Sequence, residues 1–296
     1  MSFFNRGKPG KNRLLQRIFF RPEAGTELHA MENVVSKALK REVKVRIVLP
    51  PGYYASTRAY PSLYLNDGQD LEALGLLPTL DRLFAQQKIA PFVLVAVHAD
   101  KHRMQEYGTA GQPDYKKRGR KAAAYTRFLR RELMPMLHRR YRLLQGAEQR
   151  AIAGFSLGGL SAFDIAWNHS QDFSRVGVFS GSLWWRSKAF KPKQPDADRI
   201  IHEIVKKGPK RENLKFWLEA GTKDEEADRN NNGIIDAIDD TLDLIAALKA
   251  VGYREGRDIH YLEVLGGRHH PDTWGRVMPD FLQWAFPPLV PQATNK

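Results

Sequence analysis

The sequence contains no cysteine. A chain without cysteine can form no disulfide, can offer no thiolate to a metal ion and has no cysteine nucleophile. This one absence excludes three classes of site, and it leaves the redox compartment open.

Long apolar runs are also missing. No stretch approaches the ~20 consecutive apolar residues that a helix needs to cross a membrane. The first 20 residues are basic and contain no apolar core long enough for a signal peptide. We therefore expect a cytoplasmic protein with no membrane span.

Acidic residues are scarce relative to basic ones. The chain has 33 Asp and Glu against 47 Lys and Arg, which gives a net charge of +14. Much of the excess lies in residues 116–121 and 127–142, where the basic residues are not interleaved with exposed-looking aromatic residues and no nucleic-acid-binding motif accompanies them. We interpret them as a solvated face and expect no specific nucleic-acid partner. The oligomeric state is left open.

The length of 296 residues, with 42% hydrophobic and 27% charged residues, is ordinary for a globular protein with a large core. Large α/β folds reach this length as one unit. We find no internal repeat and no linker that would divide the chain. The prediction is a single domain over residues 26–290, preceded by a basic, loosely ordered arm over residues 1–25.

The order of the expected elements indicates the α/β class. Residues 91–98 form a continuous apolar run, typical of a strand buried on both faces, and residues 43–49 alternate like a half-buried antiparallel edge strand. Pro135 is a candidate point for the helix at 121–140 to bend or end. Strands are predicted at 43–49, 61–65, 91–98, 151–153, 175–179, 213–220 and 259–265, and helices at 74–87, 121–140, 160–167, 236–250 and 271–285. Their alternation predicts a mostly parallel sheet with helices on both faces.

The most informative stretch is residues 150–159, RAIAGFSLGG, which contains Gly-x-Ser-x-Gly around Ser156. An apolar run precedes the motif and a helix-compatible run follows it. A nucleophile elbow needs this order, because the turn lifts the serine hydroxyl above the sheet in a strained conformation. Small residues let strand and helix come close enough to make the bend. The alternative is a glycine-rich loop whose serine caps the helix.

An acid and a histidine follow the serine in the order of α/β hydrolases, nucleophile, acid, histidine. Asp224 lies just past one predicted strand and His269 just past another. The imidazole would activate the serine, and the carboxylate would fix the tautomer of the imidazole. Residues near these two leave alternatives open: Glu219, Glu225 and Glu226 for the acid, and His270 for the base.

Two further parts of an acyl-transfer site have candidates. The backbone N–H groups of Leu157 and Gln69 are expected to form the oxyanion hole, the second in the turn-forming cluster at 66–69. Trp184 and Trp185 follow a strand end, and we expect at least one of them to line the acyl or alcohol pocket. The alternatives are an ordinary turn and core packing, with one tryptophan buried and one exposed.

The chain resembles the putative-esterase family of α/β hydrolases, which includes enterochelin (siderophore) esterases, feruloyl esterases, S-formylglutathione hydrolases and mycolyltransferase-like proteins. The matching stretches run from about residue 34 to 286: residues 36–39, 49–53, 60–69, 103–107, 125–133, the elbow, 179–185 and 266–274. The family's Gly-Gly-x-His pattern, followed by a tryptophan, falls on His269 and Trp274, and its acid position falls on Asp224. The resemblance implies a serine esterase that acts through an acyl-enzyme on a small-molecule ester, without a catalytic cofactor. Alternatives on the same fold are an acyltransferase and a non-catalytic binding protein.

Residues 228–239 match the calcium-loop template, with oxygen ligands at positions 1, 3, 5, 9 and 12, glycine at 6 and an apolar residue at 8. An aspartate replaces the usual bidentate glutamate at position 12, so the loop resembles a dockerin-type half-hand more than a paired EF-hand. The alternative is a polar turn whose last part caps a helix. The expected ligands of a structural Ca²⁺ are Asp228, Asn230, Asn232, Ile234 through its carbonyl, Asp236 and Asp239.

Overall fold

The computed structural model of the protein describes residues 26–288. The predicted basic arm, residues 1–25, lies outside the described residues, as do the last two residues of the predicted domain.

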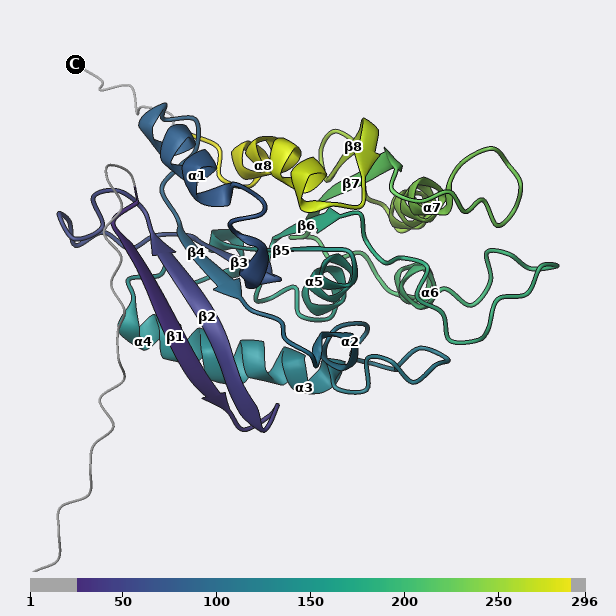
Figure 1. The fold of residues 1–296 in the computed structure, drawn as a ribbon, viewed down its shortest axis with the longest axis horizontal. Coiled ribbons are helices and arrows are strands. Elements are labelled where there is room, and N and C mark those ends of the chain that lie inside the picture. The colour runs from purple at the N-terminus through teal and green to yellow at the C-terminus, as the bar shows by residue number, and fades with distance from the viewer. Residues whose placement is uncertain (1–25, 289–296) are drawn as a thin grey trace, which may run out of the picture.

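One eight-stranded sheet organises this part of the chain, in the order β1-β2-β4-β3-β5-β6-β7-β8 (Figure 1). β2 pairs antiparallel with β1 and β4, whereas the remaining neighbours are all parallel. This arrangement confirms the predicted α/β class and the α/β-hydrolase fold. The strands are β1 (Leu28–Ser36), β2 (Arg41–Leu49), β3 (Ser62–Asn66), β4 (Val93–Val97), β5 (Arg150–Phe155), β6 (Arg175–Phe179), β7 (Lys215–Lys223) and β8 (Ile259–Arg268).

Helices cover both faces of the sheet because its central strands are apolar on both sides. In β4, Val95 belongs to one hydrophobic cluster and Leu94 to the other. The α1 and α8 helices pack on the second cluster, and α3 to α7 pack on the first (Figure 1). The helices are α1 (Leu76–Ala85), α2 (Arg103–Glu106), α3 (Ala122–Arg127), α4 (Met134–Arg140), α5 (Leu157–Asn168), α6 (Ile200–Lys207), α7 (Asp236–Ala250) and α8 (Pro271–Ala285), with shorter turns η1 (Gly68–Asp70) and η3 (Ala147–Gln149) and a π-helix, η2 (Phe128–Leu133).

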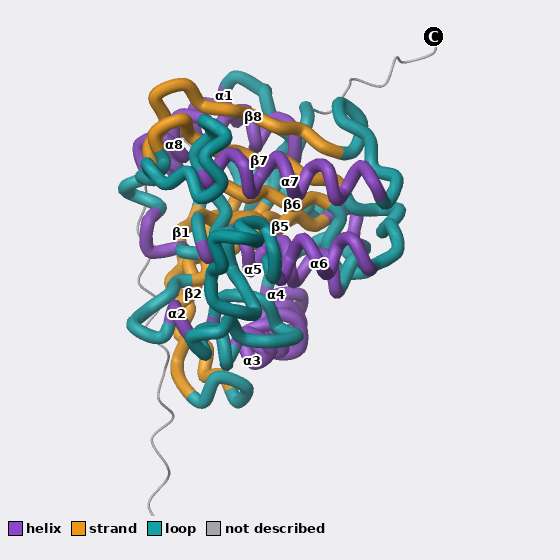
Figure 2. Tube along the Cα trace, turned by 90° about the vertical axis from the view of Figure 1, so that its right-hand side faces the viewer, coloured by secondary structure: helices purple, strands orange, loops and turns teal. Residues whose placement is uncertain are grey.

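Loops gather on one side of the molecule. Figure 2 shows long loops facing the viewer in front of the sheet, beside α2, α5 and α6. The parallel strands give the same direction to β3, β5, β6, β7 and β8, so the loops that follow these strands all start at one edge of the sheet. That edge is where open α/β sheets place their ligands.

One sequence prediction is wrong. Residues 43–49 do not form an edge strand, since β1 pairs along the whole length of β2 and takes the edge position itself.

The helix at 121–140 does not end at Pro135. Helical residues continue from α3 through the π-helix η2 into α4, and Pro135 lies in the first turn of α4. The π-helix lies directly before the proline, so the irregular part of this helix adjoins the residue that lacks a backbone N–H.

Candidate active site

Ser156 occupies the turn between β5 and α5 with φ 54° and ψ −123°. A non-glycine residue in this region carries strain on the order of 1–3 kcal/mol, which the surrounding structure must hold. The sharp bend requires glycine at position 154, because a Cβ there would lie only 2.4 Å from the carbonyl oxygen of Gly158. Strand and helix therefore touch backbone to backbone, and the serine is raised to the edge of the sheet as the motif predicted.

The Ser156 backbone is bound on both sides. Its N–H donates to the carbonyl of Phe179 at 2.8 Å, and its carbonyl accepts from the N–H of Ser182 at 3.0 Å. Its hydroxyl lies 3.2 Å from the hydroxyl of Ser182. Leu157 is the first residue of α5, so its N–H belongs to the helix turn that has no acceptor within the helix.

Asp224 and His269 follow two paired strands. Lys223 at the end of β7 and Arg268 at the end of β8 are paired in the sheet. Asp224 and His269, which follow them, therefore leave the same edge of the sheet side by side. The Asp224 carboxylate attracts a proton to His269, but desolvation by the surrounding protein outweighs it and lowers the pKa of His269. Burial in turn raises the pKa of Asp224.

Aromatic packing connects His269 to the elbow. The imidazole lies edge-on to the indole of Trp274, with ring centroids 5.2 Å apart. The same indole stacks on Phe155, the residue before the serine, at 5.0 Å. No hydrogen bond among the described residues joins Ser156, His269 and Asp224, and both carboxylate oxygens of Asp224 are without a partner. Hydrogen bonds of this kind often tighten only when substrate is bound.

The rival residues have other partners. His270 caps α8, where its Nδ1 accepts from the N–H of Asp272 at 3.3 Å. Glu219 lies inside β7, and its carboxylate accepts from the N–H of Ser180 at 3.1 Å. The Glu225 carboxyl is near the charges of the α7 start, and desolvation together with those charges raises its pKa to about 7.

The second predicted oxyanion donor lies in the loop after β3. Gln69 is in η1, and its side-chain oxygen accepts from the N–H of Ala99 at 2.9 Å, which holds the turn. Asn66 ties the same loop to the elbow by donating to the carbonyl of Gly158 at 2.8 Å. The loop that carries Gln69 is thus attached to the first turn of α5, which carries Leu157.

The sequence profile of the family described as "Putative esterase" matches residues 36–285. The chain belongs to this esterase family.

Similar proteins agree with this placement. YbbA, an uncharacterized protein of Bacillus subtilis (strain 168), is 22% identical over 244 residues, which cover 81% of this chain and 91% of YbbA. A ferulic acid esterase has a TM-score of 0.66 and 17% identity, covering 87% of this chain and 97% of that one. The enterobactin esterase of Shigella flexneri has a TM-score of 0.67 and 22% identity, covering 87% of this chain and 58% of that one. At these identities the solved structures show a shared fold, and the family supports esterase activity in general terms.

The described residues of this esterase include no helix that combines the length and the apolar character needed to cross a membrane.

A cavity of about 570 Å³ lies beside the loop after β7. Three of its lining residues are exposed aromatic side chains, Tyr115, Trp184 and Phe190. Arg118 lies over the Trp184 ring at 5.0 Å from its centroid. The rest of the lining is basic, acidic and polar, with one alanine: Lys116, Arg118, Arg186, Arg229, Asp228, Asp236, Asn231 and Ala227.

The two tryptophans predicted for the pocket have different environments. Trp184 is 39% exposed and lines the cavity, whereas Trp185 is fully buried. Its indole packs where a Cβ on Gly108 or Gly119 would be 3.0 Å away, so it belongs to the core and not to the pocket.

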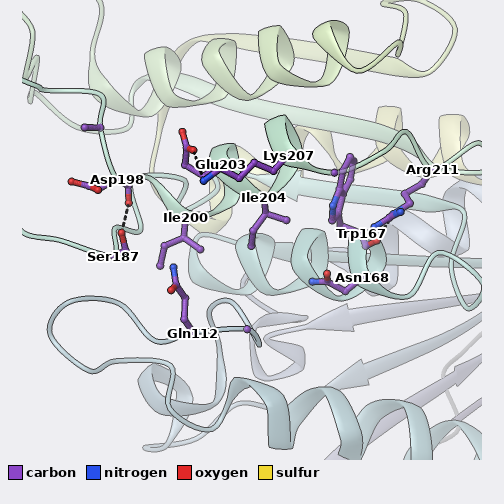
Figure 3. A pocket seen from close by; sticks show the side chains of 13 residues that line it. Gln112, Trp167, Asn168, Ser187, Asp198, Ile200, Glu203, Ile204, Lys207 and Arg211 are labelled. Carbon is purple, nitrogen blue, oxygen red and sulfur yellow. Dashed lines mark hydrogen bonds and ion pairs between the residues drawn. The ribbon is translucent and has the colours of Figure 1, made fainter.

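A larger cavity, of about 770 Å³, lies between α5 and α6 (Figure 3). Figure 3 shows Trp167 and Asn168 from α5 facing Ile204 and Lys207 from α6. None of the predicted catalytic residues lines this cavity or the 570 Å³ cavity. The two differ in position: the smaller one lies beside the loop that follows Asp224, whereas the larger one is lined mainly by α5, α6 and the segments beside them.

Side-chain oxygens of the loop at 228–236 accept hydrogen bonds from the backbone of the same loop. The carboxylate of Asp228 accepts from the N–H groups of Asn232 and Gly233, at 3.1 and 2.9 Å. The side-chain oxygen of Asn232 accepts from the N–H of Ile234 at 2.8 Å, and Asn230 donates to Asp239 at 2.8 Å. Among the described residues, the acidic side chains that gather within 4.8 Å are Asp196, Asp239 and Asp243, so the predicted ligands Asp228 and Asp236 do not join Asp239 in such a group.

Arg229 forms ion pairs with acidic residues of this loop. The Arg229 guanidinium lies 3.1 Å from Asp236 and 3.6 Å from Asp239. Asp239 has carboxylate oxygens within 4.8 Å of Asp196 and Asp243, which were not in the predicted ligand set. A cation bound by the loop would therefore share two carboxylates with Arg229.

Ser180 and Glu219, the second of which is one of the alternative acids offered by the sequence, form a buried polar group. Ser180 has φ 45°, and its hydroxyl accepts from the Trp274 indole at 2.8 Å and donates to Glu219 at 3.3 Å. Glu219 is 1% exposed, and burial together with the charge of Asp224 raises its pKa to about 8. The sequence does not predict the contacts of Glu219 with Ser180, because only the fold brings the ends of β6 and β7 together.

This pKa predicts a pH-dependent stability. Native Glu219 holds its proton up to about pH 8, whereas the unfolded chain loses it near the ordinary value of 4.5. Proton binding therefore stabilises the native state at low pH, and the stabilisation is lost as pH rises through about 8. We expect Glu219→Gln to raise the melting temperature at pH 9 and to leave it nearly unchanged at pH 4.

Thermal unfolding of both proteins across this pH range tests the expectation, and Glu203→Gln on the exposed side of α6 is the control. Equal pH dependence of the wild type and Glu219→Gln would show that Glu219 is ionised in the native protein.

Proposed function

We propose that this esterase is a serine carboxylester hydrolase with Ser156 as nucleophile, His269 as base and Asp224 as the orienting acid. The observation that carries the proposal is the strained Ser156 backbone, φ 54° and ψ −123°, at the strand-to-helix turn. Asp224 and His269 start from register partners at the same edge of the sheet, which supports their roles.

In the first half of the proposed reaction, the Ser156 hydroxyl attacks the ester carbonyl while His269 takes its proton. A lowered pKa keeps His269 neutral and ready to accept that proton at neutral pH. Asp224 then stabilises the imidazolium. The N–H groups of Leu157 and Gln69 would hold the oxyanion, where one donor contributes ~3 kcal/mol.

In the second half, the imidazolium gives its proton to the leaving alcohol, and an acyl-enzyme is left on Ser156. Water, activated by the same imidazole, releases the acid. An alcohol in place of water would make the protein an acyltransferase, so hydrolysis must be measured against transfer to an added alcohol.

We further propose that one part of the substrate is aromatic and carries a negative charge. The support is the 570 Å³ cavity, where Trp184, Tyr115 and Phe190 offer ring faces. Four basic side chains in the lining, Lys116, Arg118, Arg186 and Arg229, outnumber the two acidic ones, Asp228 and Asp236, so the lining has a net positive charge. The solved neighbours named for ferulic acid and for enterobactin are consistent with an aromatic ester.

We also propose a structural calcium ion in the loop at 228–239. The support is the match to the calcium-loop template and the turn that the side-chain oxygens of Asp228, Asn230 and Asn232 form by accepting backbone N–H groups. Asp224 precedes this loop by four residues, so a bound ion would rigidify the segment that positions the acid. Nothing in the proposed chemistry requires the metal.

The triad predicts large losses of activity. We expect Ser156→Ala and His269→Ala each to lower kcat by several orders of magnitude, and the double variant to be little worse, because the residues act as a unit. Asp224→Asn should cost somewhat less. The measurement is steady-state hydrolysis of an aryl acetate, with labelling of Ser156 by a fluorophosphonate.

The matched control is His270→Ala, which removes only the α8 cap and should retain activity. Full activity of His269→Ala together with loss in His270→Ala would reverse the assignment. Folded wild type that fluorophosphonate does not label would favour a non-catalytic binding protein.

Replacement of the two adjacent tryptophans should affect different properties, substrate preference for Trp184 and stability for Trp185. Trp184→Ala should change the ratio of kcat/KM between feruloyl and acetyl esters by about tenfold, since only ring contacts at one pocket are lost. Trp185→Ala should instead destabilise the fold by ~3–5 kcal/mol. Substrate panels and denaturant unfolding of both variants measure this. A destabilised Trp184→Ala with an unchanged substrate profile would assign this side chain to packing.

A bound calcium ion should raise the melting temperature of the protein. An ion that binds only the native state adds ~2.7 kcal/mol of stability at a hundredfold excess over its Kd. We expect EGTA to lower the melting temperature of the wild type, added calcium to restore it, and Asp228→Ala to abolish the response. If calorimetry detects no binding to the wild type, the loop is only a polar turn.

A further inference from the structure

Arg103, the first residue of α2, holds together two segments of the site that are far apart in the sequence. Its Nε and Nη2 donate to the two carboxylate oxygens of Asp67, at 2.7 and 2.8 Å. Nη2 also donates to the carbonyl of Phe155 at 3.2 Å. Asp67 begins the loop that carries Gln69, and Phe155 precedes the nucleophile. One guanidinium therefore joins the oxyanion loop to the elbow.

The Asp67 carboxylate is packed directly on the elbow. Asp67 is 1% exposed, and a Cβ on Gly158 would lie 2.5 Å from its Oδ2. The residue is in the left-handed region, φ 61°, and its N–H donates to the hydroxyl of Tyr107 at 3.2 Å. A buried carboxylate in a strained turn needs its cation, because an unpaired charge there would be costly.

We propose that Arg103 is a positioning residue: its two-pronged contact with Asp67 and its contact with Phe155 set the distance between the oxyanion loop and Ser156. The inference rests on the proposed function, and it adds to it a residue that neither donates to the substrate nor exchanges a proton. Lysine cannot replace it, since an ammonium group lacks the planar fork that reaches both carboxylate oxygens and the carbonyl together.

The same charge also acts on the base. Arg103 lies near enough to His269 to lower its pKa, in the same direction as desolvation and against the attraction of Asp224. The guanidinium therefore contacts the oxyanion loop and the elbow, and its charge also acts on the imidazole.

A second buried ion pair, between β2 and α2, supplies a matched control. Arg41, the first residue of β2, donates to the carboxylate of Glu106, the last residue of α2, at 2.8 and 2.5 Å, and Glu106 is 2% exposed. This pair has the same two-pronged geometry and its carboxylate belongs to the same short helix as Arg103, but it makes no hydrogen bond with the elbow or with residues 66–69. Its loss should destabilise the fold without moving the oxyanion loop.

The experiment compares the full-length wild type with Arg103→Lys, Arg103→Gln and Arg41→Lys. For each protein, kcat and KM are measured on an aryl acetate, with the melting temperature. We expect both Arg103 variants to lose at least tenfold in kcat, with KM within threefold of the wild type, because small displacements of catalytic groups affect the transition state more than substrate binding. Arg41→Lys should show a comparable melting shift and a kcat within twofold of the wild type.

Two outcomes would overturn the inference: kcat within twofold of the wild type for Arg103→Lys and Arg103→Gln, or an equal loss of kcat in Arg41→Lys. Arg103→Gln keeps two N–H donors without the charge, so a folded variant is available if Arg103→Lys does not fold. Wild-type turnover and fluorophosphonate labelling are measured first in the same assay. Their absence would count against the proposed serine esterase, whereas an active wild type with active Arg103 variants would count against the positioning role alone.

Discussion

The close approach of β5 and α5 at Ser156 is the constraint on which the rest of the site depends. Two backbones can meet there only because Gly154 has no Cβ to strike the carbonyl of Gly158. The resulting strain at Ser156 is held by hydrogen bonds from both sides, to Phe179 and from Ser182. The tight turn also places the Leu157 N–H, at the start of a helix whose dipole favours negative charge, next to the serine.

Burial around this turn makes the electrostatics of the site a balance between desolvation and a few fixed charges. Desolvation lowers the pKa of His269 and raises that of Asp224, although the two groups attract each other. No cation among residues 26–288 lowers the pKa of Glu219, which holds its proton up to about pH 8, and this limits the negative charge beside Asp224. Asp67, equally buried, has the Arg103 guanidinium as its partner instead.

Local patterns predicted the elements that local chemistry determines. Residues 236–250 and 271–285 form helices with the predicted bounds, because amphipathic spacing and a proline in the first turn are properties of the segment itself. The prediction of an edge position for β2 is wrong. Its alternating polar side chains suggested an edge strand, but β1 pairs with β2 along its whole length and lies outside it in the sheet. Pairing between strands depends on partners elsewhere in the chain, and a single segment does not report them.

The sequence by itself determined the family, the α/β class, the strand-to-helix turn at Ser156 and the order of the candidates Ser156, Asp224 and His269, because each is a short motif or a periodic pattern. Only the tertiary structure decided that Trp184 faces a cavity while Trp185 is buried, that His270 caps a helix, and that Arg103 reaches both Asp67 and Phe155. These facts depend on which surfaces the sheet and helices bring together. Burial and hydrogen-bond partners are set by neighbours that lie tens of residues away in the chain.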